Sequence, residues 1–127
     1  MGRNRDSAKK AGTAFETLIN AYLAEHVDDR IERRRPNGNH DRGDSSGVRL
    51  SPALGGGCVV LEQKDYGGKF LVSSWLAEAD DERGNDDALA SAVIAKRRMI
   101  GAPGRQLVLA TVDDLVALLT GRRPEVR

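Results

Sequence analysis

The sequence predicts an α/β fold in which a mixed central β-sheet is flanked by helices. Three observations favour this class: an amphipathic helical pattern near the N-terminus, two strand-like segments joined by a glycine-rich turn, and two short apolar runs in the second half of the chain. With a short additional strand and two further helices, the expected order is α-β-β-β-α-β-β-α.

The first half of the chain predicts one helix, one short strand and a hairpin. A helix is expected over residues 7–27, because its apolar residues recur at helical spacing: Ala11, Phe15, Leu18, Ile19, Tyr22 and Leu23. A short strand is expected around Ile31, and Pro36 opens a loop. Two strands, over 44–50 and 58–65, then flank "SPALGGG", whose proline and glycines can reverse the chain.

The second half predicts two helices and two buried strands. A helix is expected from near Ser74 to Gly84 and Asn85, with a strongly acidic solvent side. The runs "ALASAVIA" and "QLVLA" are short and apolar, as buried strands are. In the last helix, Thr111 and Asp114 have capping-box spacing, and Gly121 marks the end.

Composition indicates a single soluble domain. A chain of 127 residues fits one core, so we expect one domain over 1–127, with flexible tails at 1–6 and 122–127. The basic N-terminus is not followed by an apolar segment and no long apolar run is present, so we expect a cytosolic protein that does not associate with membranes. A net charge of +1 does not suggest a uniformly basic nucleic-acid binder, and 4% aromatic residues argue against a single-strand stacking platform.

The strand over 58–65 ends in charged residues. Alternation places Glu62 and Lys64 on one face, and a hairpin symmetric about residue 53 would set Val48 opposite Cys58 and Asp44 opposite Glu62. Opposed like charges, with Cβ atoms roughly 5 Å apart, are destabilising unless something compensates. A hard divalent cation such as Mg²⁺ or Mn²⁺ would do so, and Lys64 could then hold a water or a phosphate oxygen.

Structural alternatives remain open for each of these residues. Asp44 could close a turn, and Glu62 with Lys64 could be a solvated strand end with a weak surface ion pair. Glu16 has capping-box spacing from Thr13 and could satisfy the backbone N–H there.

Asp44, then Glu62-Gln63-Lys64 at a strand end, preceded by a helix that carries Glu16, resembles the PD-(D/E)XK nuclease superfamily. The resemblance is closest to the archaeal-type and phage Holliday junction resolvases and covers approximately residues 10–121. "GDSSGV" resembles the strand with the family's aspartate, "VVLEQK" resembles its ExK strand, and "WLAEADDERGNDDALASAVIAKR" is similar to a segment of actinobacteriophage resolvases. Gly43 stands where the family often has a proline before the aspartate.

The resemblance implies a restriction-endonuclease-like core and a Mg²⁺-dependent endodeoxyribonuclease, with Mn²⁺ as a substitute. It implies that Asp44, Glu62 and the main-chain carbonyl of Gln63 ligate the metal. Lys64 would position the attacking water and stabilise charge on the phosphate. Glu16 would ligate or orient the metal through water.

The implied partners are DNA, in the form of four-way junctions, and a second copy of the chain in a homodimer. A protein of the bacterial cytosol, encoded by the host or by a phage, would fit this resemblance. We expect DNA phosphates to be contacted by six basic residues: Arg33, Arg34, Arg35, Arg42, Lys96 and Arg97. These residues could equally form solvated surfaces. The acidic residues between Glu78 and Asp87 would repel DNA and should point away from it.

Two alternative functions remain. One is another nuclease of the same superfamily, acting in nicking, restriction or repair. The other is a DNA-binding protein that keeps the fold without catalysis.

Overall fold

The computed structural model describes residues 4–34 and 43–125. Their elements follow the predicted order: α1 (Arg5–His26), β1 (Glu32–Arg33), β2 (Ser45–Ser46), β3 (Val59–Lys64), α2 (Val72–Asn85), β4 (Ala90–Ala95), β5 (Leu107–Leu109) and α3 (Val112–Thr120). The mixed α/β class is therefore confirmed. Among these residues, no helix combines the length and the apolar character needed to cross a membrane.

The main sheet has three strands in the order β3-β4-β5, and β1 pairs with β2 in a separate antiparallel ladder. Strands β3 and β4 are parallel, with Val59 opposite Ala90 and Lys64 opposite Ala95. Helix α2 makes the crossover between them, as parallel neighbours require. Strand β5 is antiparallel to β4, which makes the sheet mixed as predicted.

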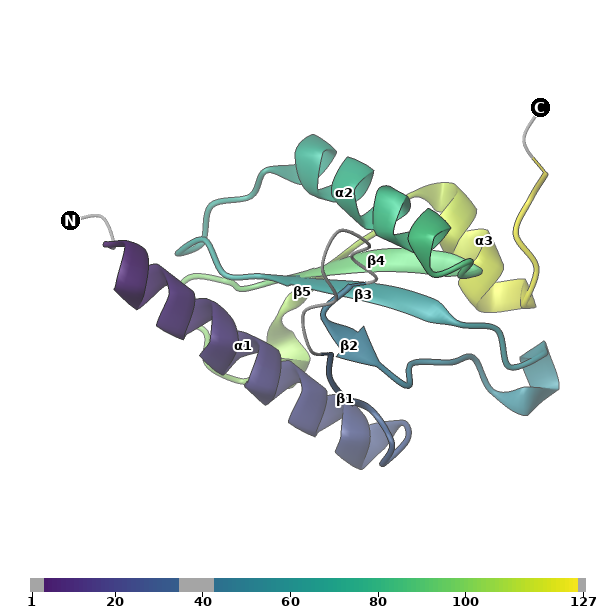
Figure 1. The fold of residues 1–127 in the computed structure, drawn as a ribbon, viewed down its shortest axis with the longest axis horizontal. Helices are drawn as coiled ribbons and strands as arrows, with labels where there is room; N and C mark the ends of the chain where they lie inside the picture. The colour runs from purple at the N-terminus through teal and green to yellow at the C-terminus, as the bar shows by residue number, and fades with distance from the viewer. Residues whose placement is uncertain (1–3, 35–42, 126–127) are drawn as a thin grey trace.

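The two faces of this sheet are covered by different helices, as Figure 1 shows with α1 and α2 on either side of the strands. Phe15 and Ile19 of α1 pack with Leu61 and other residues of one face. Trp75 and Ala79 of α2 pack against the opposite face. Because side chains alternate along a strand, β3 turns its odd-numbered residues toward α1 and its even-numbered residues toward α2.

The predicted hairpin register is wrong by one residue. Arg49, not Val48, lies opposite Cys58, and the first strand of the hairpin is regular only at Ser45–Ser46, where it pairs with β1. Further along, the Asp44 N–H donates to the Leu61 carbonyl at 2.8 Å, so the offset between the two segments changes as at a bulge. Asp44 therefore does not lie directly opposite Glu62 in a continuous ladder.

Strand β5 is an edge strand and is not buried as predicted. Val108 is 64% exposed. The apolar run "QLVLA" has the composition of a buried strand, but β5 is hydrogen-bonded to β4 on one side only in the three-stranded sheet. Composition alone does not show which strand lies at the edge.

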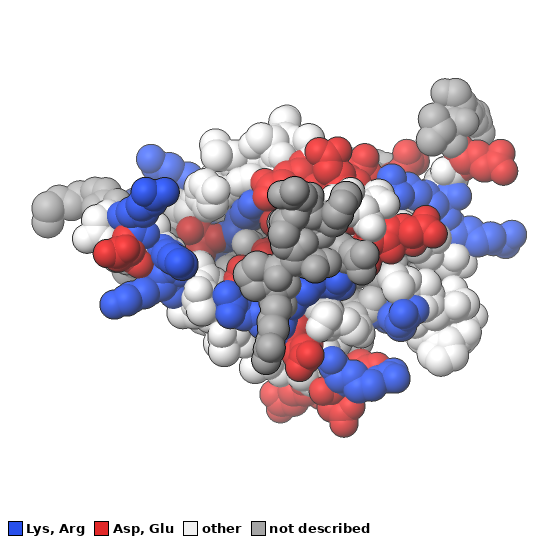
Figure 2. All heavy atoms as spheres, in the orientation of Figure 1, with Lys and Arg blue, Asp and Glu red and all other residues white. Residues whose placement is uncertain are grey.

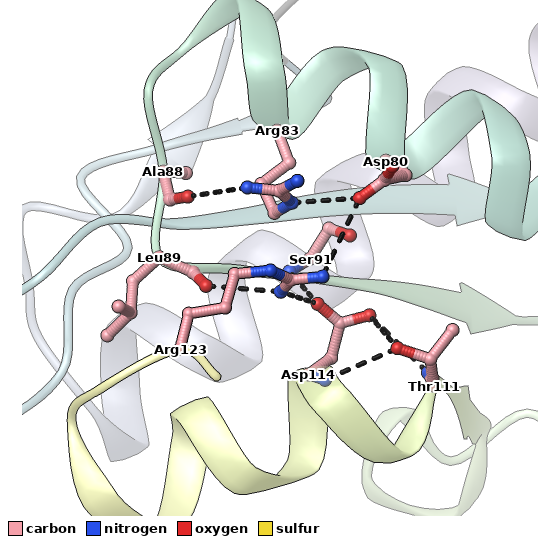
Figure 3. Close-up of polar contacts among 8 residues, drawn as sticks. All are labelled: Asp80, Arg83, Ala88, Leu89, Ser91, Thr111, Asp114 and Arg123. Carbon is pink, nitrogen blue, oxygen red and sulfur yellow. Dashed lines mark hydrogen bonds and ion pairs between the residues drawn. The ribbon is translucent and has the colours of Figure 1, made fainter. Parts of the chain in front are cut away.

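Some residues of the two predicted flexible tails make hydrogen bonds in the structure. Asn4 caps α1 by accepting a hydrogen bond from the Ser7 N–H. At the other end, Arg123 binds the Asp114 carboxylate at 2.6 Å and the Leu89 carbonyl at 3.2 Å. Figure 3 shows Arg123 between α2, the start of β4 and α3. Residues 4–6 are therefore part of the capped start of α1, and Arg123 is bound to the domain.

Candidate active site

Glu62 and Lys64 lie on the α2 side of β3, where two carboxylates of α2 meet them. The Lys64 Nζ is 3.5 Å from the Glu62 Oε1 and 3.0 Å from both carboxylate oxygens of Glu78. Glu62 and Glu82 are buried, whereas Glu78 is half-exposed. We call Glu62, Lys64, Glu78 and Glu82 the β3–α2 cluster.

The two glutamates of α2 were missed as site residues by the sequence analysis. The sequence analysis expected the acidic residues of this helix to point away from DNA, and the structure places Glu78 beside Lys64 and Glu82 beside Glu62. The helical spacing contains the signal: Trp75, Glu78, Ala79 and Glu82 fall at i, i+3, i+4 and i+7, which is one helix face. Because Trp75 and Ala79 pack in the core, the same face carries Glu82 into the protein interior.

The electrostatics of the β3–α2 cluster are dominated by excess negative charge. The pKa of Glu62 is raised to about 11, chiefly by burial, then by a hydrogen bond with the Glu82 carboxyl and by the charges of Asp44 and Glu82, against the opposing effect of Lys64. Its Oε2 is buried and finds no hydrogen-bond donor among the described residues. Burial and the neighbouring carboxyl groups therefore favour the protonated form of Glu62 when no metal is bound.

Lys64 remains charged in this environment. Burial lowers its pKa, but the hydrogen bond to Glu78 and the charges of Glu62 and Glu78 outweigh this effect, and the net shift is upward. Lys64 therefore supplies one positive charge beside three carboxyl groups.

The three carboxylates fit a hard divalent cation. Glu62, Glu78 and Glu82 each have an oxygen within 4.8 Å of the others. Carboxylate oxygens are the ligands that Mg²⁺ prefers, often with water completing its shell. The closeness of the buried Glu62 and Glu82 carboxyl groups and the one-to-three ratio of ammonium to carboxyl groups in the β3–α2 cluster both favour a cation here.

Asp44 is brought to the end of β3 by main-chain contacts. Its Oδ2 accepts a hydrogen bond from the Gln63 N–H at 2.8 Å, and its charge contributes to the raised pKa of Glu62. Gly43, with φ of +92°, passes so close to β3 that a Cβ there would lie 2.9 Å from the Leu61 carbonyl oxygen. The structure thus brings Asp44 near Glu62, although the three-carboxylate group consists of other residues.

Gln63 faces the other side of β3. Its side chain is buried, and its Nε2 donates to the Ser45 Oγ at 2.7 Å. This bond fixes the Asp44–Ser45 segment against β3. The predicted role of the Gln63 carbonyl as a metal ligand stays a prediction.

Glu16 lies on α1 and not within the β3–α2 cluster. Its Oε2 accepts a hydrogen bond from the Arg33 Nε at 2.6 Å. The capping-box alternative is wrong, because α1 begins at Arg5 and Thr13 is well inside the helix. Arg33 is paired with Ser45, the neighbour of Asp44, in the β1–β2 ladder, so Glu16 approaches the Asp44 segment from the α1 side.

Comparisons of this chain with protein-family models, with curated proteins and with solved structures give no match.

The predicted DNA-binding residues have contacts within the protein. Arg33 binds Glu16, and Arg34 lies 3.6 Å from an Asp86 oxygen. The Lys96 Nζ donates to the main-chain carbonyls of Arg97 and Ile100, which stabilises the loop after β4. Arg35 and Arg42 lie outside the described residues. Figure 2, drawn from the same side as Figure 1, shows basic side chains in several separate groups and acidic side chains along the edge formed by α2.

Proposed function

We propose that this protein is a metal-dependent endonuclease with a restriction-endonuclease-like core, which hydrolyses phosphodiesters in branched DNA. The observation that carries the proposal is the buried Glu62 beside Lys64 at the end of β3, with the Lys64 Nζ 3.5 Å from the Glu62 Oε1. The position of Asp44 against the same strand end supports it.

The residues of the site would have different roles in the reaction. Glu62, with Asp44 or the α2 glutamates, would hold Mg²⁺ or Mn²⁺, which supplies a water of lowered pKa and polarises the phosphate. Lys64 would place its ammonium group beside the reacting phosphate, where fixed positive charge stabilises the transition state. Half-exposed Glu78 marks the side from which solvent and substrate can reach the buried Glu62.

A homodimer is part of the proposal, because symmetric cleavage of a four-way junction needs two active sites. Apolar residues on adjacent elements support a self-association surface: Val112, Leu115 and Leu119 lie at i, i+3 and i+7 of α3 and are exposed, as is Val108 on the edge strand β5. Exposed apolar patches of this kind often mark protein interfaces. A two-fold axis would place two β3–α2 clusters in one assembly.

The proposal is tested by cleavage of a labelled four-way junction, a flap and a linear duplex in Mg²⁺ and in EDTA. We expect metal-dependent cleavage of branched DNA that is lost in the Glu62→Gln variant. Cleavage of all three substrates alike would indicate a different nuclease of this type. Binding without cleavage in Mg²⁺ and in Mn²⁺ would contradict the enzyme proposal and favour a non-catalytic DNA-binding protein.

A further inference from the structure

The loop that follows Lys64 presents an aromatic surface beside the candidate active site. Tyr66 and Phe70 are 49% and 41% exposed. Both rings make edge contacts with Trp75, with centroid distances of 5.1 and 6.4 Å. Trp75 is buried in the core beneath α2. Two half-exposed rings are therefore supported by a buried one, which orders them at the surface.

This aromatic surface borders the β3–α2 cluster. Tyr66 is two residues beyond Lys64, and its phenol group is close enough to contribute to the raised pKa of that lysine. A nucleotide lying on Tyr66 would thus be a neighbour of the phosphate that Lys64 is proposed to contact.

A basic cavity opens at the same end of the sheet. Because β3 and β4 are parallel, the loops after them leave from one edge, and they enclose a cavity of about 190 Å³ whose lining includes Arg97 and Arg98. Asp65 also lines this cavity, and its Oδ1 accepts a hydrogen bond from the Gly67 N–H at 3.1 Å. The two arginines and Lys96 outnumber that single acid among the described lining residues.

The two loops approach closely at a glycine. Gly68 has φ of +93°, and a Cβ on it would lie 2.7 Å from the Cβ of Arg98. A side chain at Gly68 would therefore push Arg98 away. Lys96, which binds carbonyls of its own loop, stabilises this arrangement from the other side.

We propose that Tyr66, Phe70, Arg97 and Arg98 bind an unpaired nucleotide of the DNA substrate, with its base on the aromatic rings and its phosphate beside the arginines. Bases stack on aromatic side chains with little sequence preference, and the planar guanidinium group suits phosphate oxygens. This inference rests on the proposed function and narrows the substrate to branched DNA that has, or can open, an unpaired nucleotide next to the cleaved bond.

Low aromatic content had argued against a stacking platform. The chain has five Trp, Tyr and Phe residues in total, yet Tyr66, Phe70 and Trp75 gather at this one place. Composition counts the rings but does not locate them.

The first test measures binding in Ca²⁺ by fluorescence anisotropy, with a labelled blunt duplex and the same duplex carrying a single-stranded flap. We expect the flap substrate to bind about 10-fold tighter. Replacing both rings, Tyr66→Leu with Phe70→Leu, should remove roughly that 10-fold preference and leave duplex affinity unchanged. Tyr66→Phe keeps the ring and should bind as the wild type does. Arg98→Gln should weaken binding of the flap substrate and reduce its salt dependence by about one phosphate contact.

A second measurement needs no variant. The wild-type protein is added to flap DNA in which the first unpaired base is 2-aminopurine, whose fluorescence falls when the base stacks. Quenching by the wild type supports the inference even if the double variant fails to fold. Equal affinity for flap and blunt duplex, or unchanged 2-aminopurine fluorescence on binding, would overturn it.

Cleavage in Mg²⁺, measured separately, distinguishes the two proposals. Cleavage of branched DNA without stacking would refute only the platform. Stacking without cleavage in any divalent metal would refute only the nuclease.

Discussion

Two carboxyl groups of this protein, Glu62 and Asp114, are buried to the same extent, each with 3% of the residue exposed, yet their surroundings are opposite. Asp114 accepts hydrogen bonds from the Ser91 N–H at 3.1 Å, the Thr111 hydroxyl at 2.8 Å and the Arg123 guanidinium at 2.6 Å (Figure 3). Glu62 has other carboxyl groups around it and one ammonium group at 3.5 Å.

The pKa values follow the partners. Burial raises the pKa of Asp114, but the hydrogen bonds from Arg123, Ser91 and Thr111 outweigh it and the net shift is downward. At Glu62 burial and carboxyl neighbours act in the same direction, and the pKa is raised. The folded chain itself therefore supplies the hydrogen-bond donors and the positive charge that stabilise ionised Asp114, whereas Glu62 needs a proton or a cation. Strongly raised carboxyl pKa values in such places are typical of functional sites.

The largest expected difference between the two regions is in catalysis. Glu62→Gln should reduce cleavage of branched DNA by roughly 10³-fold, because the variant lacks an anionic metal ligand at the reacting centre. Single-turnover cleavage in Mg²⁺ measures the effect. Asp114→Asn is the matched control and should cleave at the wild-type rate below its own unfolding temperature. Equal losses in both variants would mean that Glu62 has no special role.

The next largest effect is on stability, and here the loss is expected at Asp114 and not at Glu62. Asp114→Asn should lower the free energy of unfolding by about 3 kcal/mol, since it removes the closest carboxylate partner of Arg123 and weakens the cap of α3. Urea unfolding measures this change. Arg123→Gln should cost a similar amount, and the double variant less than the sum of the two. Additive losses would show that Asp114 and Arg123 act independently.

A smaller, opposite change is expected at Glu62. In the metal-free protein, Glu62→Gln should raise the free energy of unfolding by about 1–2 kcal/mol at pH 8, because a neutral amide removes the cost of keeping a proton on a buried acid that ionises in the unfolded chain. Glu78→Gln, which removes a half-exposed carboxylate partner of Lys64, should change stability by less than about 1 kcal/mol. Destabilisation by Glu62→Gln in EDTA would argue that the carboxylate is a structural partner of Lys64.

The smallest effects are in the pH dependence, and their signs differ. Glu62 has a folded pKa above its unfolded value of 4.5, so its contribution to stability is present below that pH and is lost as pH rises toward 11. Asp114 has a folded pKa below 3.8, so its contribution is present above that value and is lost as pH falls. Thermal midpoints in EDTA should therefore diverge between wild type and Glu62→Gln from pH 5 to pH 9. Wild type and Asp114→Asn should converge from pH 5 to pH 3.

Local features of the fold could be predicted because short-range physics determines them. Thr111 and Asp114 form the predicted capping box, and Gly121 ends α3 with φ of +78°. The other bonds of Asp114, to Ser91 and Arg123, join residues that are distant in the sequence and carry no local signal. The same distinction explains the hairpin: its existence follows from the turn residues, but its register depends on contacts that a symmetric turn does not fix.

The candidate site could be predicted in part for the same reason. Glu62 and Lys64 stand out because charge interrupts an apolar strand within a few residues. Glu78 and Glu82 follow from helical spacing only when α2 is known to pack on the even-numbered face of β3, a tertiary fact. The stacking of Tyr66 and Phe70 on Trp75 likewise appears only after folding.

Mn²⁺ binding tests the central claim most directly, because Mn²⁺ can be followed by electron paramagnetic resonance and by calorimetry without DNA. We predict that the wild-type protein and Asp114→Asn bind Mn²⁺ alike, with a rise in thermal midpoint, and that Glu62→Gln weakens binding by roughly 100-fold. A wild-type protein that binds no Mn²⁺, or a Glu62→Gln variant that binds it as tightly as the wild type, would contradict the account.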